Sequence, residues 1–161
     1  SGEQFVDECQ VESDLELLLP ATYVTGSSER MLLYRELDSL TLDKDVEDFR
    51  TRLIDRFGPI PSETEELLRI VPLRRLAARL GAEKVFLKGG RMSLFFVSNP
   101  DSPYYQSQAF GKVIAYMMKY TRRCDLREQN TRRSMLVKDV KNVETAVSVL
   151  QEIVAMQVEE G

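Results

Sequence analysis

The sequence predicts an α+β protein of one domain, in which an antiparallel sheet packs with about five helices. In the first half of the chain, apolar residues recur at steps of three and four, which is typical of helices. In the second half, two pairs of short β-prone runs are each separated by two turn residues, which is typical of hairpins. Strands and helices do not alternate regularly, so a parallel nucleotide-binding α/β fold is not expected.

The N-terminal half is expected to hold one strand and then helices. The run "DLELLLP", residues 14–20, predicts a strand that its proline closes. A helix over residues 26–40 follows, with Ser27 or Ser28 as its cap. The next helix is expected to begin near Asp43, a good N-cap. Steps of three and four predict the apolar face of that helix, formed by Leu42, Val46, Phe49, Leu53 and Phe57.

The stretch "FGPIP" predicts a rigid corner at the end of this helix. After Phe57, Gly58 can adopt the positive φ that a helix stop often needs. Pro59 lacks an N–H and cannot continue the helix. Pro61 fixes the backbone again just before the next helix, so the four residues are interpreted as a structural corner between two helices.

The third helix is expected to start with a capping box made by Ser62 and Glu65 and to run to Gly81. Pro72 lies inside this segment and lacks a backbone donor. A kink or two abutting helices are therefore expected there.

The second half predicts the remaining strands and helices. A hairpin is expected around Gly89 and Gly90, and a helix over residues 104–120. A second hairpin is expected around residues 129–130, and a helix over residues 142–157 closes the chain. The expected domain is 14–156, with 1–13 as a linker or tag remnant and 157–161 as a tail.

The composition excludes several kinds of chemistry. The chain has no histidine, which removes histidine bases and histidine metal ligands. Two cysteines, Cys9 and Cys124, cannot build a structural zinc site alone. There is no G-x-x-x-x-G-K-[ST] loop to hold the phosphates of a nucleotide. Neither catalytic residues nor a metal or cofactor are predicted, and a small hydrolase is disfavoured because no nucleophile–base pair can be named.

The chain also carries no signal for export or for a membrane. No apolar run approaches the roughly 18 residues of a membrane span, and the first residues lack the basic start and apolar core of a signal peptide. The two distant cysteines suggest thiols that stay reduced, so a cytoplasmic location is expected.

Positive charge gathers in one late stretch although the net charge of the chain is −4. Residues 119–141 contain five closely spaced arginines, which are Arg122, Arg123, Arg127, Arg132 and Arg133. One interpretation is a set of solvated faces, which the acidic overall balance favours. The alternative is a nucleic-acid-binding module that uses the basic hairpin.

Five stretches together resemble a known family. They are "LLLPATYV…ERMLLYREL", "LIDRFGPIP", "LLRIVPLRRLAARLG", "DSPYYQSQAFGKVIAYM" and "LVKDVKNVETAVSVLQEI". The chain resembles, from about residue 14 to 153, the C-terminal domain of bacterial transcription-repair coupling factors, also called Mfd proteins. The corner after "LYREL" is the most specific of these features.

The resemblance implies a regulatory function without catalysis. Full-length members of the family are ATP-driven DNA translocases that push against stalled RNA polymerase. They then recruit UvrA through a UvrB-like module, for nucleotide excision repair. The C-terminal domain is expected to pack against that module of the same polypeptide and to mask its UvrA-binding surface, which is autoinhibition. The implied partners are the UvrB-like module and, through the whole protein, UvrA, RNA polymerase and DNA.

Asp55 and Arg52 are the candidate contact residues of this domain. Asp55 lies about opposite the apolar stripe of its helix, and an anion in the last turn is unfavourable there. One hypothesis is a local pair with Arg52, three residues back. The other is a cation on the UvrB-like module, because the resemblance implies acidic contact positions on this helix. Arg52 departs from that pattern, since relatives can carry an acid there.

Overall fold

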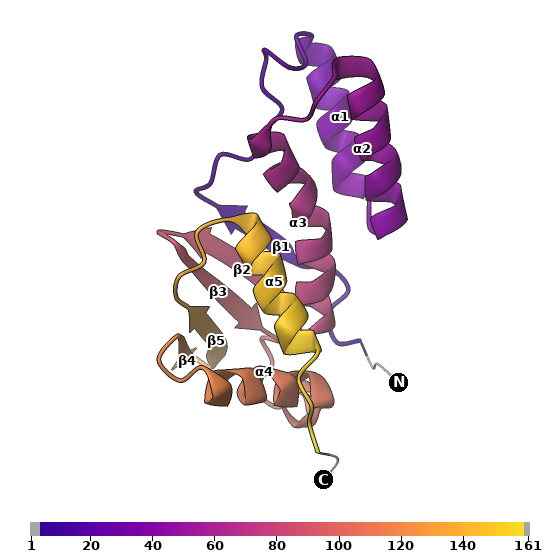
Figure 1. Cartoon of the computed structure of the whole chain (residues 1–161). Helices are drawn as coiled ribbons and strands as arrows, with labels where there is room; N and C mark the ends of the chain where they lie inside the picture. Colours follow the sequence, from indigo (N-terminus) through magenta and orange to yellow (C-terminus); the bar gives the residue numbers. More distant parts are fainter. Residues whose placement is uncertain (1–3, 160–161) are drawn as a thin grey trace. The chain divides into compact units, whose positions relative to one another are not determined.

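The computed structural model describes residues 4–159 and confirms the α+β class (Figure 1). The chain forms two compact units. The helical unit is Glu16–Pro72, and the sheet unit comprises the chain up to Leu15 together with the chain from Leu73 onward. The boundary between them falls inside helix α3 (Ser62–Arg79), directly after Pro72. Since α3 is a single helix, two abutting helices at Pro72 are excluded, and a kink there stays a prediction.

The helical unit packs α1 (Ser27–Ser39) and α2 (Asp43–Phe57) with the first part of α3. Its core contains one buried residue of α1, three of α2 and two of α3, which are Leu37, Val46, Phe49, Leu53, Leu68 and Val71. The predicted stripe of α2 is therefore buried along most of its length. Leu42 is the exception, because it precedes the first turn and is 58% exposed.

The predicted N-caps of the first two helices lie one or two residues too late in the sequence. Gly26 and Leu42 are the N-caps, and neither makes a side-chain capping bond. Ser27 and Asp43 are instead the first helical residues. Acidic residues in both first turns still suit the positive N-terminal end of the helix.

The first strand lies earlier than predicted. Residues 14–20 form no strand, because their backbone forms hydrogen bonds with side chains and not with a neighbouring strand. The Thr64 hydroxyl donates to the Leu18 carbonyl at 2.8 Å, and the Leu19 N–H donates to the Tyr34 oxygen at 2.7 Å. The strand is β1 (Gln10–Ser13), inside the segment expected to be a linker or tag remnant. Val6 and Cys9 are also buried, so this part of the segment is folded. Residues 1–3 lie outside the described residues.

The sheet unit contains both predicted hairpins. They are β2 (Ala82–Lys88) with β3 (Arg91–Phe96), and β4 (Cys124–Gln129) with β5 (Arg132–Val137). The strand order is β1-β2-β3-β5-β4. The pairs β2–β3, β3–β5 and β5–β4 are antiparallel, as predicted, whereas β1 pairs with β2 in parallel.

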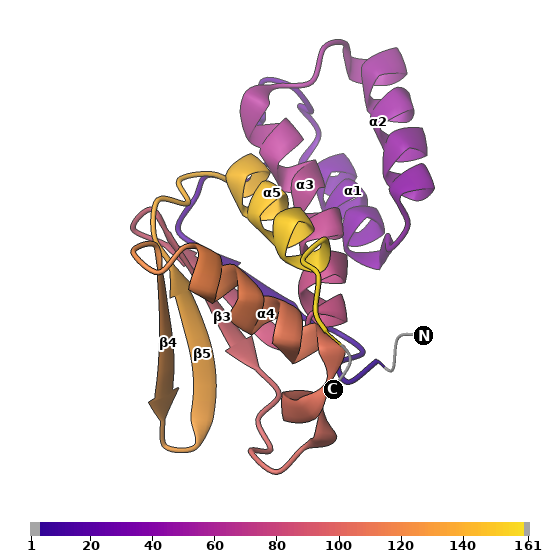
Figure 2. The same cartoon turned by 60° about the horizontal axis from the view of Figure 1, so that its bottom comes forward.

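Two helices of the sheet unit lie on one side of the sheet (Figures 1 and 2): α4 (Gln108–Lys119) and α5 (Val143–Val154). The segment predicted as one helix over 104–120 is divided into a short 3-10 helix, η1 (Pro103–Gln106), and α4. The division lies at Ser107, whose side chain accepts from the Phe110 N–H and caps the N-terminus of α4. Alternate strand residues are fully buried, among them Val85, Leu94 and Met135. Of the predicted tail, residues 157–159 are in neither a helix nor a strand.

Candidate functional site

The corner at the end of α2 is shaped by Gly58. Its φ is 88° and its ψ is −163°, a region that is essentially restricted to glycine. The Gly58 N–H donates to the Ile54 carbonyl at 2.9 Å and closes the last turn of α2. Pro59 is exposed and Pro61 is half-buried, directly before α3 begins. The backbone therefore turns sharply between two helices of the same unit.

Tyr23 braces this corner, a contact that local sequence patterns do not predict. The Tyr23 hydroxyl lies 2.8 Å from the Gly58 carbonyl oxygen and 3.2 Å from that of Leu53. Its ring packs beside Phe57, with centroids 5.6 Å apart. Burial, and secondarily the charge of Glu65, raise the pKa of the Tyr23 hydroxyl. The last carbonyls of a helix need such donors, so Tyr23 stabilises the helix end.

Arg52 binds α1 and not Asp55. Its guanidinium pairs with the carboxylate of Glu36 and lies 5.4 Å from the ring centre of Phe49. Arg56, the residue after Asp55, pairs with Glu29 in the same way. Among residues 4–159, Asp55 forms no ion pair, and its side chain is exposed. The hypothesis of a local Arg52–Asp55 pair is therefore not supported by the geometry.

An apolar pocket of about 320 Å³ opens beside Asp55. Four hydrophobic residues and three charged ones line it, which are Leu33, Phe49, Leu53, Phe57, Arg52, Asp55 and Arg56. Large apolar side chains are also exposed on α1 and α2, the helices that form the pocket: Met31 is 56%, Leu32 63% and Ile54 46% exposed. An apolar hollow with one unpaired carboxylate can take an apolar side chain and a neighbouring cation of another protein module.

The five arginines of the late basic stretch do not form one patch. Arg122 is exposed in the turn before β4. Arg123 is used within the fold, since it donates to the carbonyls of Lys138 and Asp139 at 2.9 and 3.1 Å. Arg133 lies over the ring of Tyr105, with 4.3 Å between its guanidinium carbon and the ring centre.

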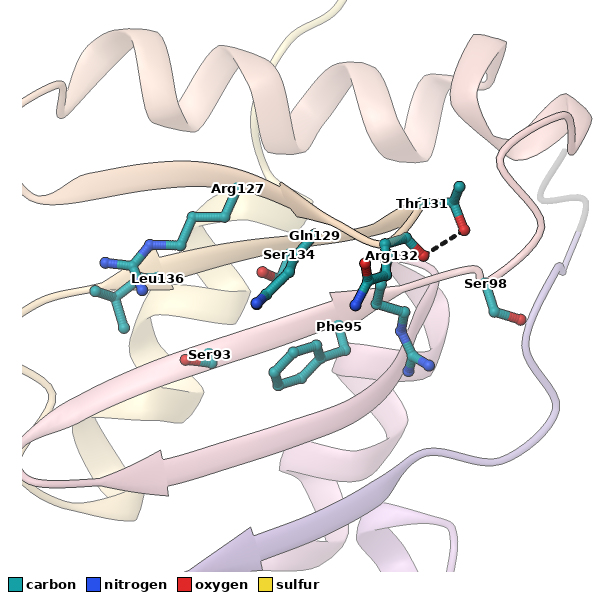
Figure 3. A pocket seen from close by; sticks show the side chains of 10 residues that line it. Ser93, Phe95, Ser98, Arg127, Gln129, Thr131, Arg132, Ser134 and Leu136 are labelled. Carbon is teal, nitrogen blue, oxygen red and sulfur yellow. Dashed lines mark hydrogen bonds between the residues drawn. The ribbon is translucent and has the colours of Figure 1, made fainter.

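Arg127 and Arg132 line a common groove on the sheet, which the other three arginines do not line (Figure 3). Of the five arginines that the sequence places in one basic stretch, two thus share a surface and three do not. The separation depends on strand register and on the turn before β4, neither of which a run of arginines reveals.

Neither a metal centre nor a disulfide occurs within residues 4–159. No group of three or more Cys, Asp or Glu side chains there could hold a metal ion. Both thiols, Cys9 and Cys124, are buried and form no disulfide. Burial raises the pKa of the Cys9 thiol to about 12. In the described part of the chain, no helix is both long and apolar enough to span a bilayer.

The architecture, a helical unit joined through α3 to a sheet unit with a mixed five-stranded sheet, is that of a known class of α+β domain. A solved structure titled "Crystal structure of C-terminal domain of transcription-repair coupling factor" superposes with a TM-score of 0.68, covering 91% of this chain and 93% of that one at 17% identity. Residues 13–107 match the family profile of the TRCF domain. The chain belongs to the TRCF domain family.

Curated relatives agree with this assignment. A transcription-repair-coupling factor of Rickettsia bellii is 30% identical over 131 residues, which are 81% of this chain and 11% of the relative. That of Escherichia coli K12 is 32% identical over 78 residues, covering 48% of this chain and 7% of the relative. The chain thus spans about a tenth of the length of the relatives it matches. The resemblance to the C-terminal domain of these factors is confirmed.

Proposed function

We propose that this chain is a non-catalytic, autoinhibitory domain of a transcription-repair coupling factor. In this function it packs against the UvrB-like module of the same polypeptide and masks the surface that binds UvrA. The observation that carries the proposal is the exposed Asp55 carboxylate beside an apolar pocket, with both neighbouring arginines already paired to α1.

The whole protein is proposed to be an ATP-dependent DNA translocase of transcription-coupled nucleotide excision repair in the cytoplasm. Supporting this, the stretch that the relatives share with this chain is only 7–12% of their own length, and each is named a transcription-repair-coupling factor. RNA polymerase, UvrA and DNA would then be partners of the other modules. Within this chain we expect no ATP hydrolysis, because its sequence holds no phosphate loop.

The geometry suits a contact that forms and breaks. Gly58 and Tyr23 hold the end of α2, so the direction of Asp55 is set before any partner arrives. A preorganised group loses little conformational entropy on binding. A lysine or arginine of the UvrB-like module would meet Asp55, while an apolar side chain beside it entered the pocket. One charge pair and one apolar contact are modest enough for a competing event to open them.

Titration calorimetry of the separated UvrB-like module against this chain tests the proposal. We expect binding by the natural chain and a loss of about tenfold or more for Asp55→Arg, which removes an ion pair and adds repulsion. Asp101→Arg is the matched control, because Asp101 is exposed in the sheet unit and lines none of the pocket. Equal affinity of both variants and the natural chain would count against the proposed contact.

A further inference from the structure

The sheet has a second face that α4 and α5 do not cover (Figure 2). The fully buried residues of β3, Met92, Leu94 and Phe96, alternate with Ser93 and Phe95. Successive residues of a strand point to opposite faces. Ser93 and Phe95 therefore belong to the face away from the fully buried residues, which is called the open face below. Through the strand register, Phe86 of β2 and Ser134 of β5 share it.

Two adjoining grooves run along the open face. One, of about 480 Å³, is lined by Phe95, Arg127, Arg132 and Ser134 among others, and Figure 3 shows these side chains around it. The other, of about 370 Å³, is lined by Phe86, Lys88 and Arg91 among others. Ser93 and Leu136 line both grooves, so they form one continuous surface. Two aromatic rings and several short polar side chains thus lie between two groups of cations.

The cations at the β2–β3 turn have no anionic partner among the described residues. Lys88 and Arg91 are directly opposite each other in the strand register, and both are exposed. Like charges at opposite positions destabilise a sheet. Neither side chain forms an ion pair with any residue from 4 to 159, and the nearby Asp14 carboxylate instead accepts the Gly89 N–H at 3.0 Å. Lys141 approaches the same turn, since its Cγ would lie 3.6 Å from a Cβ added at Gly90.

The cations at the other end are only loosely paired. Arg127 lies 3.8 Å from Asp125, and Arg132 lies 3.5 Å from Glu83. The Nε atom of Arg132 is buried and has no hydrogen-bond partner among the described residues. Arg132 also lies over the ring of Phe95, at 5.6 Å from the ring centre. The long distances to Asp125 and Glu83 leave the terminal nitrogens of both guanidinium groups able to contact a bound anion as well.

We propose that the open face binds single-stranded nucleic acid. Bases would stack on Phe86 and Phe95, and phosphates would contact Lys88 and Arg91 at one end and Arg127 and Arg132 at the other. Arg91 and Phe95 are four residues apart, about 13 Å along a strand. That length suits the two or three bases that aromatic residues stack on the sheets of RNA-binding domains. The guanidinium over Phe95 can join the stack, because bases also stack on arginine planes.

The rings favour a single strand over the other anionic partners. A duplex keeps its bases stacked inside and would leave Phe86 and Phe95 without a role. An acidic peptide would meet the cations but would gain little from two separated rings. Stacking on aromatic side chains tolerates every base, so binding without strong sequence preference is expected.

Fluorescence anisotropy with a labelled single strand of about ten nucleotides, as DNA and as RNA, tests the proposal. We expect Arg91→Glu to weaken binding by about tenfold and to reduce the salt slope, because each phosphate contact contributes about 0.7 to that slope for single strands. Phe95→Leu should weaken binding to a similar degree and leave the salt slope unchanged, since stacking releases no counterions. Arg122→Glu is the matched control, because Arg122 is exposed but lines neither groove, and it should bind like the natural chain.

Several results would overturn the proposal. Equal loss in Arg91→Glu and Arg122→Glu would show general charge attraction instead of a site. Binding of a duplex as tight as that of a single strand, or unchanged affinity in Phe95→Leu, would remove the role of the rings. Competition by polyglutamate as effective as that by the unlabelled strand would identify an acidic protein segment as the ligand. No binding at about 50 mM salt would exclude the site altogether. Circular dichroism confirms that each variant is folded.

Discussion

Arg52 of α2 pairs with Glu36 of α1, and this leaves Asp55, one turn further along α2, without an ion pair among residues 4–159. Arg56 likewise forms an ion pair with Glu29 of α1. An exposed carboxylate near the negative end of a helix is slightly unfavourable by itself. Arg52, three residues back and within reach of Asp55, is held by the neighbouring helix instead. The arrangement presents a single negative charge next to an apolar pocket, which is the basis of the proposed function.

The proposed function predicts that Asp55→Arg opens the autoinhibited state of the full-length protein. The change removes the partner of a cation and adds repulsion, so UvrA binding without polymerase should rise, and DNA-dependent ATPase should rise with it. A pull-down with UvrA and an ATPase assay measure both effects. The melting temperature of the isolated chain should move little, because Asp55 contributes nothing to the core. If a folded Asp55→Arg protein retains no more UvrA than the natural protein or an Asp101→Arg control, Asp55 is only a surface charge.

Gly58→Ser should destabilise the chain by about 1–3 kcal/mol, the scale of a residue forced into a sparsely populated backbone region. The cost is conformational, because a Cβ at Gly58 would meet no atom within 4 Å. Gly26→Ser is the matched control: Gly26 has an ordinary φ of −80° and caps α1, where serine is at least as good as glycine. Urea unfolding of both variants provides the measurement. Equal stabilities would show that the corner is not restricted to glycine.

Tyr23→Phe should cost about 1 kcal/mol, the usual net contribution of a hydrogen bond. The variant keeps the ring contact with Phe57 but withdraws the hydroxyl from the carbonyls of Gly58 and Leu53. Hydrogen exchange at the end of α2 should accelerate as well, because the last turn loses its brace. A variant with natural stability and natural exchange would mean that water replaces the hydroxyl at no cost.

Much of the fold follows from local patterns in the sequence. The stripe of Val46, Phe49 and Leu53 marks α2, and Gly89 and Gly90 mark the first hairpin, because the periodicity and the turn chemistry are each contained in a few residues. The position of β1 does not follow from a local pattern, and the prediction of a strand at residues 14–20 is wrong for that reason. The pairing partner of β1, which is β2, lies about seventy residues away in the sequence. The backbone of residues 14–20 forms hydrogen bonds with side chains instead, accepting from the Thr64 hydroxyl and donating to the Tyr34 oxygen.

The candidate sites depend even more on distant residues. Helical spacing correctly predicts that Asp55 is exposed, but Glu36, which decides the partner of Arg52, lies on another helix. Likewise, the run of arginines from Arg122 to Arg133 does not reveal that Lys88 and Arg91 share a face with Arg127 and Arg132. That grouping comes from the register of four strands, which no single segment encodes.

The buried thiol of Cys9 should make the folded chain less stable at alkaline pH. Burial raises the pKa of its thiol from 9.0 to about 12 in the folded chain, against a smaller opposing effect of Arg74. Below pH 9 both the folded and unfolded states keep the proton, so the thiol adds no pH dependence. Between pH 9 and about 12 only the unfolded state releases it, and the free energy of unfolding falls as the pH rises, by at most about 1.4 kcal/mol per pH unit.

Cys9→Ala tests this directly, because alanine cannot titrate. The variant should lose some stability at every pH from the smaller side chain, but its free energy of unfolding should fall less steeply than that of the natural chain above pH 9. Urea unfolding at several pH values across that window gives both slopes. The tyrosines that burial also affects, such as Tyr116, are present in both proteins and cancel in the comparison. Parallel curves would mean that the Cys9 thiol ionises as readily in the folded chain as in the unfolded one.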